Sequence, residues 1–391
     1  MNQRERFKAV ARGEKPDYVP IFGFQGASLS LPPMDYVMDR LVSTGMPAWV
    51  GRDRNGERND KSWTDYWGTA GALFPDFYPV SGAKGFKTSV KIENGYEVTE
   101  SENGSLTRRK VEGSTRVYSM PEFIRYPVRD RESWEFYKSR TVPEKIMTDK
   151  ELEENCRRYD GRDEPLCLHA GICGYGDIRN LFGTEGASLA FYDDPELVKD
   201  IIDNSLKHAR NHVFPLVERL KPEMILKWED MSYNHGMLIS PAQFDQFFGQ
   251  GYREMCDCAR ANGVDMVTVD SDGNIMELTG VLESYGVNGI LPCEVKAGND
   301  IFALREKYPE FIFSGWLEKE SMNEGNEWMI EKEILGKVPL MMEKGRYFPN
   351  TDHFIQPLAT FKNMCRFMTL LHDVCKNPEG EFPRMEQAGV K

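Results

Sequence analysis

Short apolar runs alternate with amphipathic segments along most of the chain, and polar residues repeatedly follow the apolar runs. The clearest run lies at residues 264–273, VDMVTVDSDG, where an apolar stretch ends in Asp270 and Asp272. Such a run is typical of a strand buried on both faces. The helix predicted before it begins at Ser240-Pro241, a favourable cap and first turn, and ends at Asn262-Gly263, a common stop.

Strands and helices alternate on both sides of this run. Further strands are predicted at residues 18–24, 165–170, 224–228, 287–291, 311–315 and 345–348, with helical segments between them. This alternation favours parallel βα units. We therefore predict an α/β fold in which residues 1–391 form a single (β/α)8 TIM-type barrel domain, since such barrels need about 250 residues before insertions.

Residues 84–126 follow a different pattern, in which apolar and polar positions alternate with a period of two. Asn94-Gly95 and Asn103-Gly104 separate these runs, and Asn-Gly between alternating segments is a strong hairpin signal. We predict an antiparallel β-hairpin excursion inserted into the early barrel. It could serve as a lid or as an oligomer contact, so a homodimer is one expectation.

The charge of the chain narrows the choice of ligand. A formal net charge of −13 and a pI near 5.2 leave no Lys/Arg excess to neutralise nucleic acid or an anionic membrane. No apolar run approaches the roughly 20 residues that span a bilayer. The first residues form a charged helix rather than a signal peptide, and eight scattered cysteines fit reduced thiols. We expect a cytoplasmic protein with a small-molecule substrate.

Polar residues at the predicted strand ends are the candidate site, because catalytic groups of barrels come from the carboxyl ends of several strands. They are Glu229, Asp230, Asp270, Asp272, Glu294, Lys319, Asp352 and His353. So many acids at one mouth would repel unless a cation, a basic substrate or shared protons relieve them.

Two kinds of chemistry remain open for these residues. Asp270, Asp272 and His353 could bind zinc, iron or manganese. Alternatively, one carboxyl stays neutral as a general acid and works with His353 or Lys319. Glu229 is a further catalytic candidate. The structural alternatives are that Asp272 caps a helix and that Glu229 is salt-bridged.

Other residues are candidates for substrate binding. Gln25 follows the first strand, His169 lies in the strand at 165–170, and Asp65, Tyr66, Trp67 and Trp316 could form pocket walls. A surface loop pinned by tryptophans, or a core histidine, would explain the same residues. No G-x-G-x-x-G follows the first strand, and neither a P-loop nor a G-x-S-x-G elbow is present, which disfavours nucleotide-cofactor and serine-hydrolase functions.

Four segments together resemble the uroporphyrinogen decarboxylase superfamily, which includes corrinoid- and thiol-linked methyltransferases. They are RERFKAVARGEKPDYVPIFGF, LFGTEGASLAFYDDPELVKDIID, ISPAQFDQFF with GVDMVTVDSDGNI, and YFPNTDHFIQP. The similarity extends over nearly the whole chain and is weakest in the hairpin region. It implies a (β/α)8 barrel with its site at the carboxyl-terminal mouth.

The chain departs from both well-known branches of that superfamily. FGFQGASLS stands where true decarboxylases carry an arginine-rich RQAGR-type motif, and Asp270-Ser271-Asp272 stands where zinc methyltransferases carry His-x-Cys. A retained metal site would therefore use harder ligands. The resemblance implies methyl transfer from a small methylated compound to a thiol or to a corrinoid on a partner protein. A metal-free decarboxylase and a non-catalytic ligand-binding barrel are the alternatives.

Overall fold

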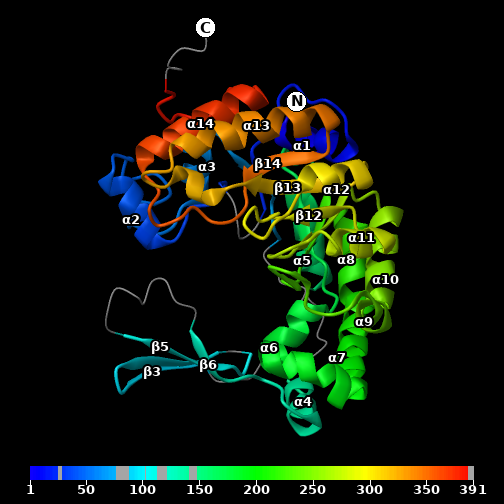
Figure 1. The fold of residues 1–391 in the computed structure, drawn as a ribbon. Helices are drawn as coiled ribbons and strands as arrows, with labels where there is room; N and C mark the ends of the chain where they lie inside the picture. The colour runs from blue at the N-terminus through cyan, green and yellow to red at the C-terminus, as the bar shows by residue number, and fades with distance from the viewer. Residues whose placement is uncertain (25–28, 76–87, 102, 112–120, 141–147, 386–391) are drawn as a thin grey trace.

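The computed structural model describes residues 1–24, 29–75, 88–101, 103–111, 121–140 and 148–385. Its centre is a six-stranded parallel sheet (Figure 1). In spatial order the strands are β14 (Tyr347–Thr351), β13 (Ile312–Leu317), β12 (Gly289–Leu291), β11 (Met266–Asp270), β8 (Met224–Trp228) and β7 (Cys167–His169). The predicted α/β class with a parallel sheet is confirmed.

A short parallel pair, β1 (Phe22–Gly23) and β2 (Ala70–Gly71), lies between the two edges of this sheet. On one side, a parallel bridge between Leu73 and Leu166 connects the segment after β2 to the start of β7. On the other side, the Asn350 amide of β14 donates to the Phe22 carbonyl over 2.9 Å. The strand expected at 18–24 is shortened to Phe22–Gly23, in part because Pro20 has no N–H to pair.

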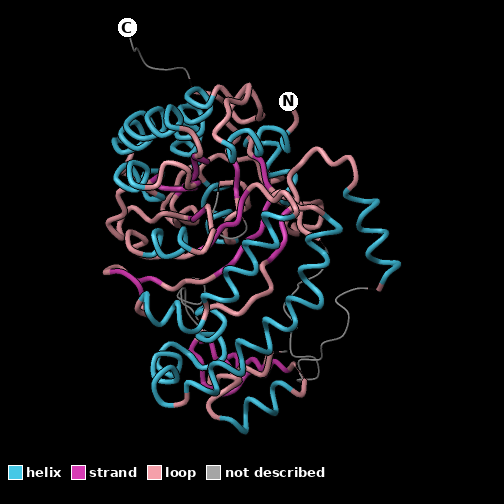
Figure 2. The backbone as a smooth tube through the Cα atoms, turned by 90° about the vertical axis from the view of Figure 1, so that its right-hand side faces the viewer, coloured by secondary structure: helices cyan, strands magenta, loops and turns pink. Residues whose placement is uncertain are grey.

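Helices lie outside the strands, as Figure 2 shows in cyan and magenta. They are α1 (Gln3–Arg12), α2 (Asp35–Ser43), α3 (Asp60–Trp67), α4 (Arg131–Lys138), α5 (Asp149–Tyr159), α6 (Tyr175–Asp193), α7 (Pro195–His208), α8 (Phe214–Leu220), α9 (Pro241–Phe247), α10 (Gly249–Ala261), α11 (Leu278–Ser284), α12 (Ile301–Lys307), α13 (Trp328–Lys344) and α14 (Phe361–Cys375). The helix predicted to start at Ser240 divides at Phe248, where Gly249 and Gly251 follow and lower the helix propensity.

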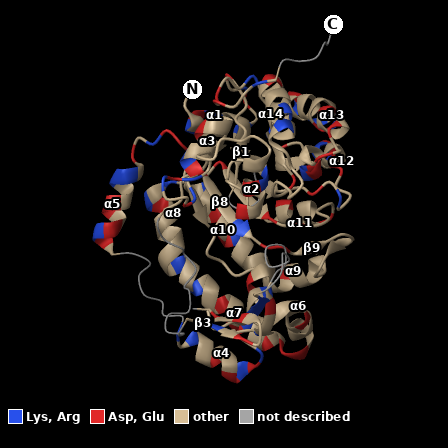
Figure 3. Ribbon diagram, turned by 90° about the vertical axis from the view of Figure 1, so that its left-hand side faces the viewer, with Lys and Arg blue, Asp and Glu red and all other residues tan. Residues whose placement is uncertain are grey.

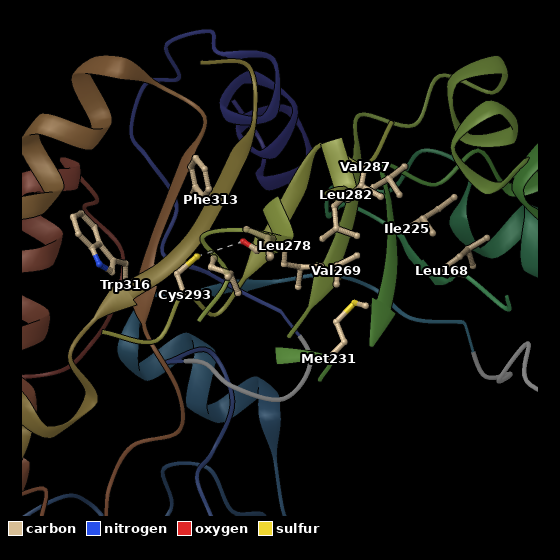
Figure 4. Packing of buried hydrophobic residues seen from close by; sticks show 14 of the residues in the cluster. Leu168, Ile225, Met231, Val269, Leu278, Leu282, Val287, Cys293, Phe313 and Trp316 are labelled. Atoms are coloured by element: carbon tan, nitrogen blue, oxygen red, sulfur yellow. Dashed lines mark hydrogen bonds between the residues drawn. The ribbon is translucent and has the colours of Figure 1, made fainter. Parts of the chain in front are cut away.

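Side chains of each strand alternate between two apolar clusters. Met266 of β11 belongs to an inner cluster with Phe22 and Phe348, and Phe7 of α1 packs on both of those rings. Val269 belongs to the outer cluster between strands and helices, part of which Figure 4 shows. The inner cluster is therefore enclosed by strands and covered by α1 at the amino-terminal end of the sheet.

The antiparallel excursion forms a separate four-stranded sheet. Its order is β3 (Ser89–Glu93), β4 (Tyr96–Glu100), β5 (Leu106–Lys110) and β6 (Glu122–Arg125). It projects away from the parallel sheet toward the side where α4 and α6 lie (Figure 1). Within the described ranges, no helix is both long and apolar enough to cross a membrane.

Candidate functional site

Strand β11 delivers Asp270 to the carboxyl-terminal end of the parallel sheet. Asp270 is in register with Trp228 of β8 and Leu291 of β12. Asp270 lies two and four residues after Thr268 and Met266 on the same strand, so the three side chains point to the same side of the sheet. That side faces the inner cluster. In the part of the chain that the structure describes, no hydrogen bond or salt bridge to its carboxyl group is found.

The surroundings of Asp270 favour its neutral form. Burial raises the pKa of this carboxyl well above its usual value, and the negative charges of Asp272 and Asp230 raise it further. Asp230 is itself fixed, because one of its oxygens accepts from Arg179 at 2.9 Å and the other from the Asp272 backbone at 3.3 Å. The Asp270 carboxyl at the end of β11 thus favours its neutral form and lies near the carboxyl groups of Asp230 and Asp272.

His353, which follows β14, pairs with Asp272. The imidazole Nε2 lies 3.6 Å from the nearer carboxylate oxygen. Burial opposes the charged imidazolium, but the hydrogen bond and the charge of Asp272 outweigh it and raise the pKa of His353. The imidazole of His353 therefore holds its proton more strongly than a free histidine does.

Lys319 joins the ends of β12 and β14. Its Nζ lies 3.1 Å from Glu294 and 3.7 Å from Asp352. Asp352 is fully buried and accepts backbone N–H groups of Val295 and Lys319, each at 2.9 Å. The other Glu294 oxygen accepts from the Gly273 backbone at 3.0 Å, next to Asp272.

These contacts link the ends of five strands into one group, which we call the mouth cluster. It comprises Asp230, Asp270, Asp272, Glu294, Lys319, Asp352 and His353. Arg179 pairs with Asp230, and one lysine and one histidine remain for the other four carboxyl groups, so a protonated carboxyl is expected on electrostatic grounds. The mouth cluster can donate and accept protons at closely spaced atoms, which is the requirement for general acid–base catalysis.

Glu229 is not part of the mouth cluster, and its predicted position there was wrong. Its side chain is fully buried on the helix side of β8, where it accepts from the Tyr252 hydroxyl and from the Gly176 backbone. A strand turns successive side chains to opposite faces, so Glu229 points away from the inner cluster. Lys227 points to the same side of β8 as Glu229. Its Nζ lies 4.0 Å from a Glu229 carboxylate oxygen and 2.5 Å from an Asp177 carboxylate oxygen.

The predicted aromatic walls also lie elsewhere. Tyr66 and Trp67 are buried on α3, and Trp67 packs against Phe361 and Phe382 near the carboxyl terminus. The Trp316 ring packs on Phe302 of α12, and its Nε1 donates to the Asn299 carbonyl. Their burial against helices and the carboxyl-terminal segment explains these aromatics without a substrate pocket.

The remaining candidates have mixed outcomes. Asp65 is an exposed residue of α3 that pairs with Lys61, one turn away. His169 is the last residue of β7, and its side chain points to the side of the inner cluster. Its pKa is lowered mainly by burial and also by the charge of Lys227. The lowered pKa favours the neutral form of this imidazole. Gln25 lies outside the described residues.

The residues expected to hold a metal do not form a ligand group. Among the residues that the structure describes, no three His, Cys, Asp or Glu side chains gather closely enough to hold a metal ion. His353 Nε2 is directed to Asp272 instead, and two of the remaining carboxylates, those of Glu294 and Asp352, lie within 4 Å of Lys319 Nζ. The donor set of Asp270, Asp272 and His353 therefore does not fit a metal as arranged.

Sequence reasoning did not identify Arg179, Lys227 or Tyr252. Arg179 orients Asp230 from α6, and its guanidinium lies over the Trp228 ring at 5.2 Å. Lys227 could have been found, because a lysine inside the otherwise apolar run MILKW requires a buried partner.

Comparison with known proteins gives a structural likeness without a matching sequence family. No protein-family model and no curated protein matches the chain. A solved structure, a methyltransferase from Methanosarcina mazei, matches with a TM-score of 0.54 and 15% sequence identity. The match covers 96% of this chain and 98% of that chain, so the likeness extends over the whole fold. At this identity it shows the fold alone.

Proposed function

We propose that this chain is a methyltransferase-like barrel enzyme of the uroporphyrinogen decarboxylase type, with the mouth cluster as its active site. The barrel consists of the six-stranded sheet closed by β1 and β2. The Leu73–Leu166 bridge and the Asn350–Phe22 hydrogen bond support this closure. The likeness to a methyltransferase structure over nearly all of both chains supports the same class of enzyme.

The observation that carries the proposed reaction is the Asp270 carboxyl at the inner end of β11, which has no hydrogen bond or salt bridge from the described residues and whose pKa is raised by burial and by the charges of Asp272 and Asp230. In methyl transfer, the bond between the methyl carbon and its heteroatom breaks, and the electron pair stays on the heteroatom. A proton delivered to that atom makes it a better leaving group, and general acids of this kind typically contribute about 10²–10⁴-fold. Asp270 is that acid in our proposal.

His353 and Asp272 then hold the proton that restores Asp270 after each turnover. The methyl group goes to a nucleophile, either a thiolate or a corrinoid carried by a partner protein. When bound, that corrinoid would supply the electron pair that forms the new bond to carbon. Because the donor-set geometry does not fit a metal, no step of this scheme uses one.

Decarboxylation is the second candidate, because the Asp270 carboxyl in its protonated form could donate a proton to the carbanion left by loss of CO2. The charges in the mouth cluster disfavour it. Lys319 already lies between two carboxyl groups, Glu294 and Asp352. The cluster therefore offers little attraction to a carboxylate substrate.

A methyl-transfer assay with free cob(I)alamin tests the proposal. The protein would be incubated with methanol, methylamines, methyl sulfides and methoxylated aromatics, and formation of methylcobalamin followed by absorbance. We expect one donor class to react, and Asp270→Asn to lower the rate by about 10²-fold or more. Lys296→Met removes an exposed positive charge beside the mouth cluster, and this variant should retain the wild-type rate.

Thiol acceptors would be tested with the same donors by mass spectrometry. CO2 release from carboxylated compounds would point to the decarboxylase instead. Tight binding of a ligand without turnover, unchanged in Asp270→Asn, would indicate a non-catalytic barrel and overturn both enzymatic proposals.

A further inference from the structure

Among the residues that the structure describes, β3 lies at an edge of its four-stranded sheet and carries two exposed apolar side chains. Within the described residues, β3 pairs with β4 only. Val90 is 65% exposed and Ile92 is 71% exposed, and both point to the same face of the sheet. Exposed edge strands normally carry protection against pairing with another chain. On β3 these two apolar residues alternate with two charged residues, Lys91 and Glu93.

The hairpin geometry turns the free backbone groups of these two residues outward. Asn94 and Gly95 both have positive φ, as in a two-residue type I′ turn. In such a hairpin the flanking pair, Glu93 and Tyr96, exchanges the hydrogen bonds, and hydrogen-bonded pairs alternate along the strand. The N–H and C=O groups of Ile92 and Val90 therefore face away from β4.

The charges on this edge are complementary to a second copy of the same strand. Lys91 and Glu93 lie on one face, are exposed, and have no ion-pair partner among the described residues. A two-fold axis at Lys91 would place two lysines opposite each other. An axis at Val90 would place Lys91 opposite Ser89 and leave it without an acid. An axis at Ile92 places each Lys91 opposite the other Glu93.

We propose that β3 pairs antiparallel with β3 of a second copy of this chain, with the two-fold axis at Ile92. The two Ile92 side chains then meet on one face, and two Lys91–Glu93 ion pairs form on the other. These ion pairs occupy non-hydrogen-bonded positions, where side chains approach most closely. The two four-stranded sheets become one continuous sheet, and the symmetry closes the assembly as a dimer.

The other edge of the sheet does not offer the same match. On β6, Glu122 already pairs with Arg108, and Arg125 with Glu100. The register of β6 against β5 is also interrupted by a bulge between Leu106 and Thr107, and such a bulge makes β6 an irregular edge for pairing with another strand. Pairing of β3 with β6 of another copy would build an open chain of molecules rather than a closed dimer.

Charge exchange on β3 tests both the dimer and its register. The full-length protein would be studied by sedimentation velocity over a wide range of concentrations. Lys91→Glu and Glu93→Lys each create two like-charge pairs and should weaken the dimer by at least about tenfold. The double variant Lys91→Glu/Glu93→Lys restores both pairs with reversed sign and should restore the dimer.

Lys110→Glu is the matched control, because it makes the same net charge change on an exposed residue of an interior strand, β5. It should leave the dimer intact. Unfolding temperatures of all variants would verify that they fold. A monomeric wild type at every concentration would overturn the proposal, as would a double variant as weak as the single ones. The outcome is independent of any methyl-transfer activity.

Discussion

The imidazole of His353 and the carboxylate of Asp272 lie 3.6 Å apart, although they follow different strands of the sheet, β14 and β11. The two residues are far apart in the sequence, and β12 and β13 lie between their strands in the sheet. The contact therefore depends on correct assembly of the whole carboxyl-terminal edge.

Asp272→Asn should lower the pKa of His353, which NMR titration of the imidazole would measure. The pKa is raised in the folded state, so the pair stabilises the fold fully below the unfolded value of about 6.5. That contribution is lost as pH rises through the folded value. The difference in unfolding free energy between wild type and variant should thus be largest in mild acid and shrink above neutral pH. A difference that stays constant with pH would contradict the proposed role of the His353–Asp272 pair.

Asp270→Asn should stabilise the protein at neutral pH while lowering activity. The folded-state pKa of Asp270 is raised, so wild-type stability falls as pH rises above the unfolded pKa of about 3.9, and the full loss is reached above the folded pKa. An amide has the same shape and no proton to lose. We expect a gain of about 0.5–2 kcal/mol above the folded pKa, measured by urea unfolding, in the range of other stabilising substitutions. The gain should vanish in acid.

Lys319→Met should destabilise the protein by about 3–5 kcal/mol, because it leaves the buried charge of Asp352 without its cation. The double variant Lys319→Met/Asp352→Asn removes that charge and should recover most of the loss. Lys296→Met, which loses only an exposed pair with Glu320, should cost less than about 1 kcal/mol. Equal losses in all three variants would refute a role for the buried charge.

Gly174→Ala should be among the most damaging single substitutions. A Cβ atom at Gly174 would lie 1.7 Å from a carboxylate oxygen of Glu229, which is itself held by Tyr252 and Gly176. Gly336→Ala in α13 is the matched control, since a Cβ there meets nothing within 4 Å. It should stabilise the helix by up to about 1 kcal/mol. Thermal unfolding would separate the two outcomes, and comparable midpoints would contradict the expected clash.

Much of the parallel sheet was predictable because its strands are short apolar runs with polar residues after them. The ends of β11, β12 and β14 fall close to where those runs stop, and this placed Asp270, Glu294 and Asp352 together in advance. The side that each residue faces was harder to predict. Glu229 and Asp230 are adjacent, and a shift of one residue decides which of them faces the inner side.

Other parts of the site could not be read from the sequence. Tyr66 and Trp67 have the composition of a pocket wall, but aromatic composition does not distinguish a pocket from a helix packed on the carboxyl-terminal segment. The raised pKa of Asp270 depends on burial created by neighbouring strands and on the charges of Asp272 and Asp230, which folding brings close. The mixing of acidic and basic residues along α5 and α7 (Figure 3) is visible in the sequence, yet it identifies no site.

The contact of α1 with β14 has a consequence for synthesis of the chain. Phe7 packs on Phe348, and the Arg346 guanidinium donates to the Ala11 carbonyl. Because α1 is made before β14, its residues acquire these partners only after β14 has left the ribosome. Until then the inner apolar cluster is open at one seam, and contacts between such distant segments form slowly. A nascent chain that stops before β14 would therefore expose the phenylalanines of α1 and β1 to aggregation or to chaperones.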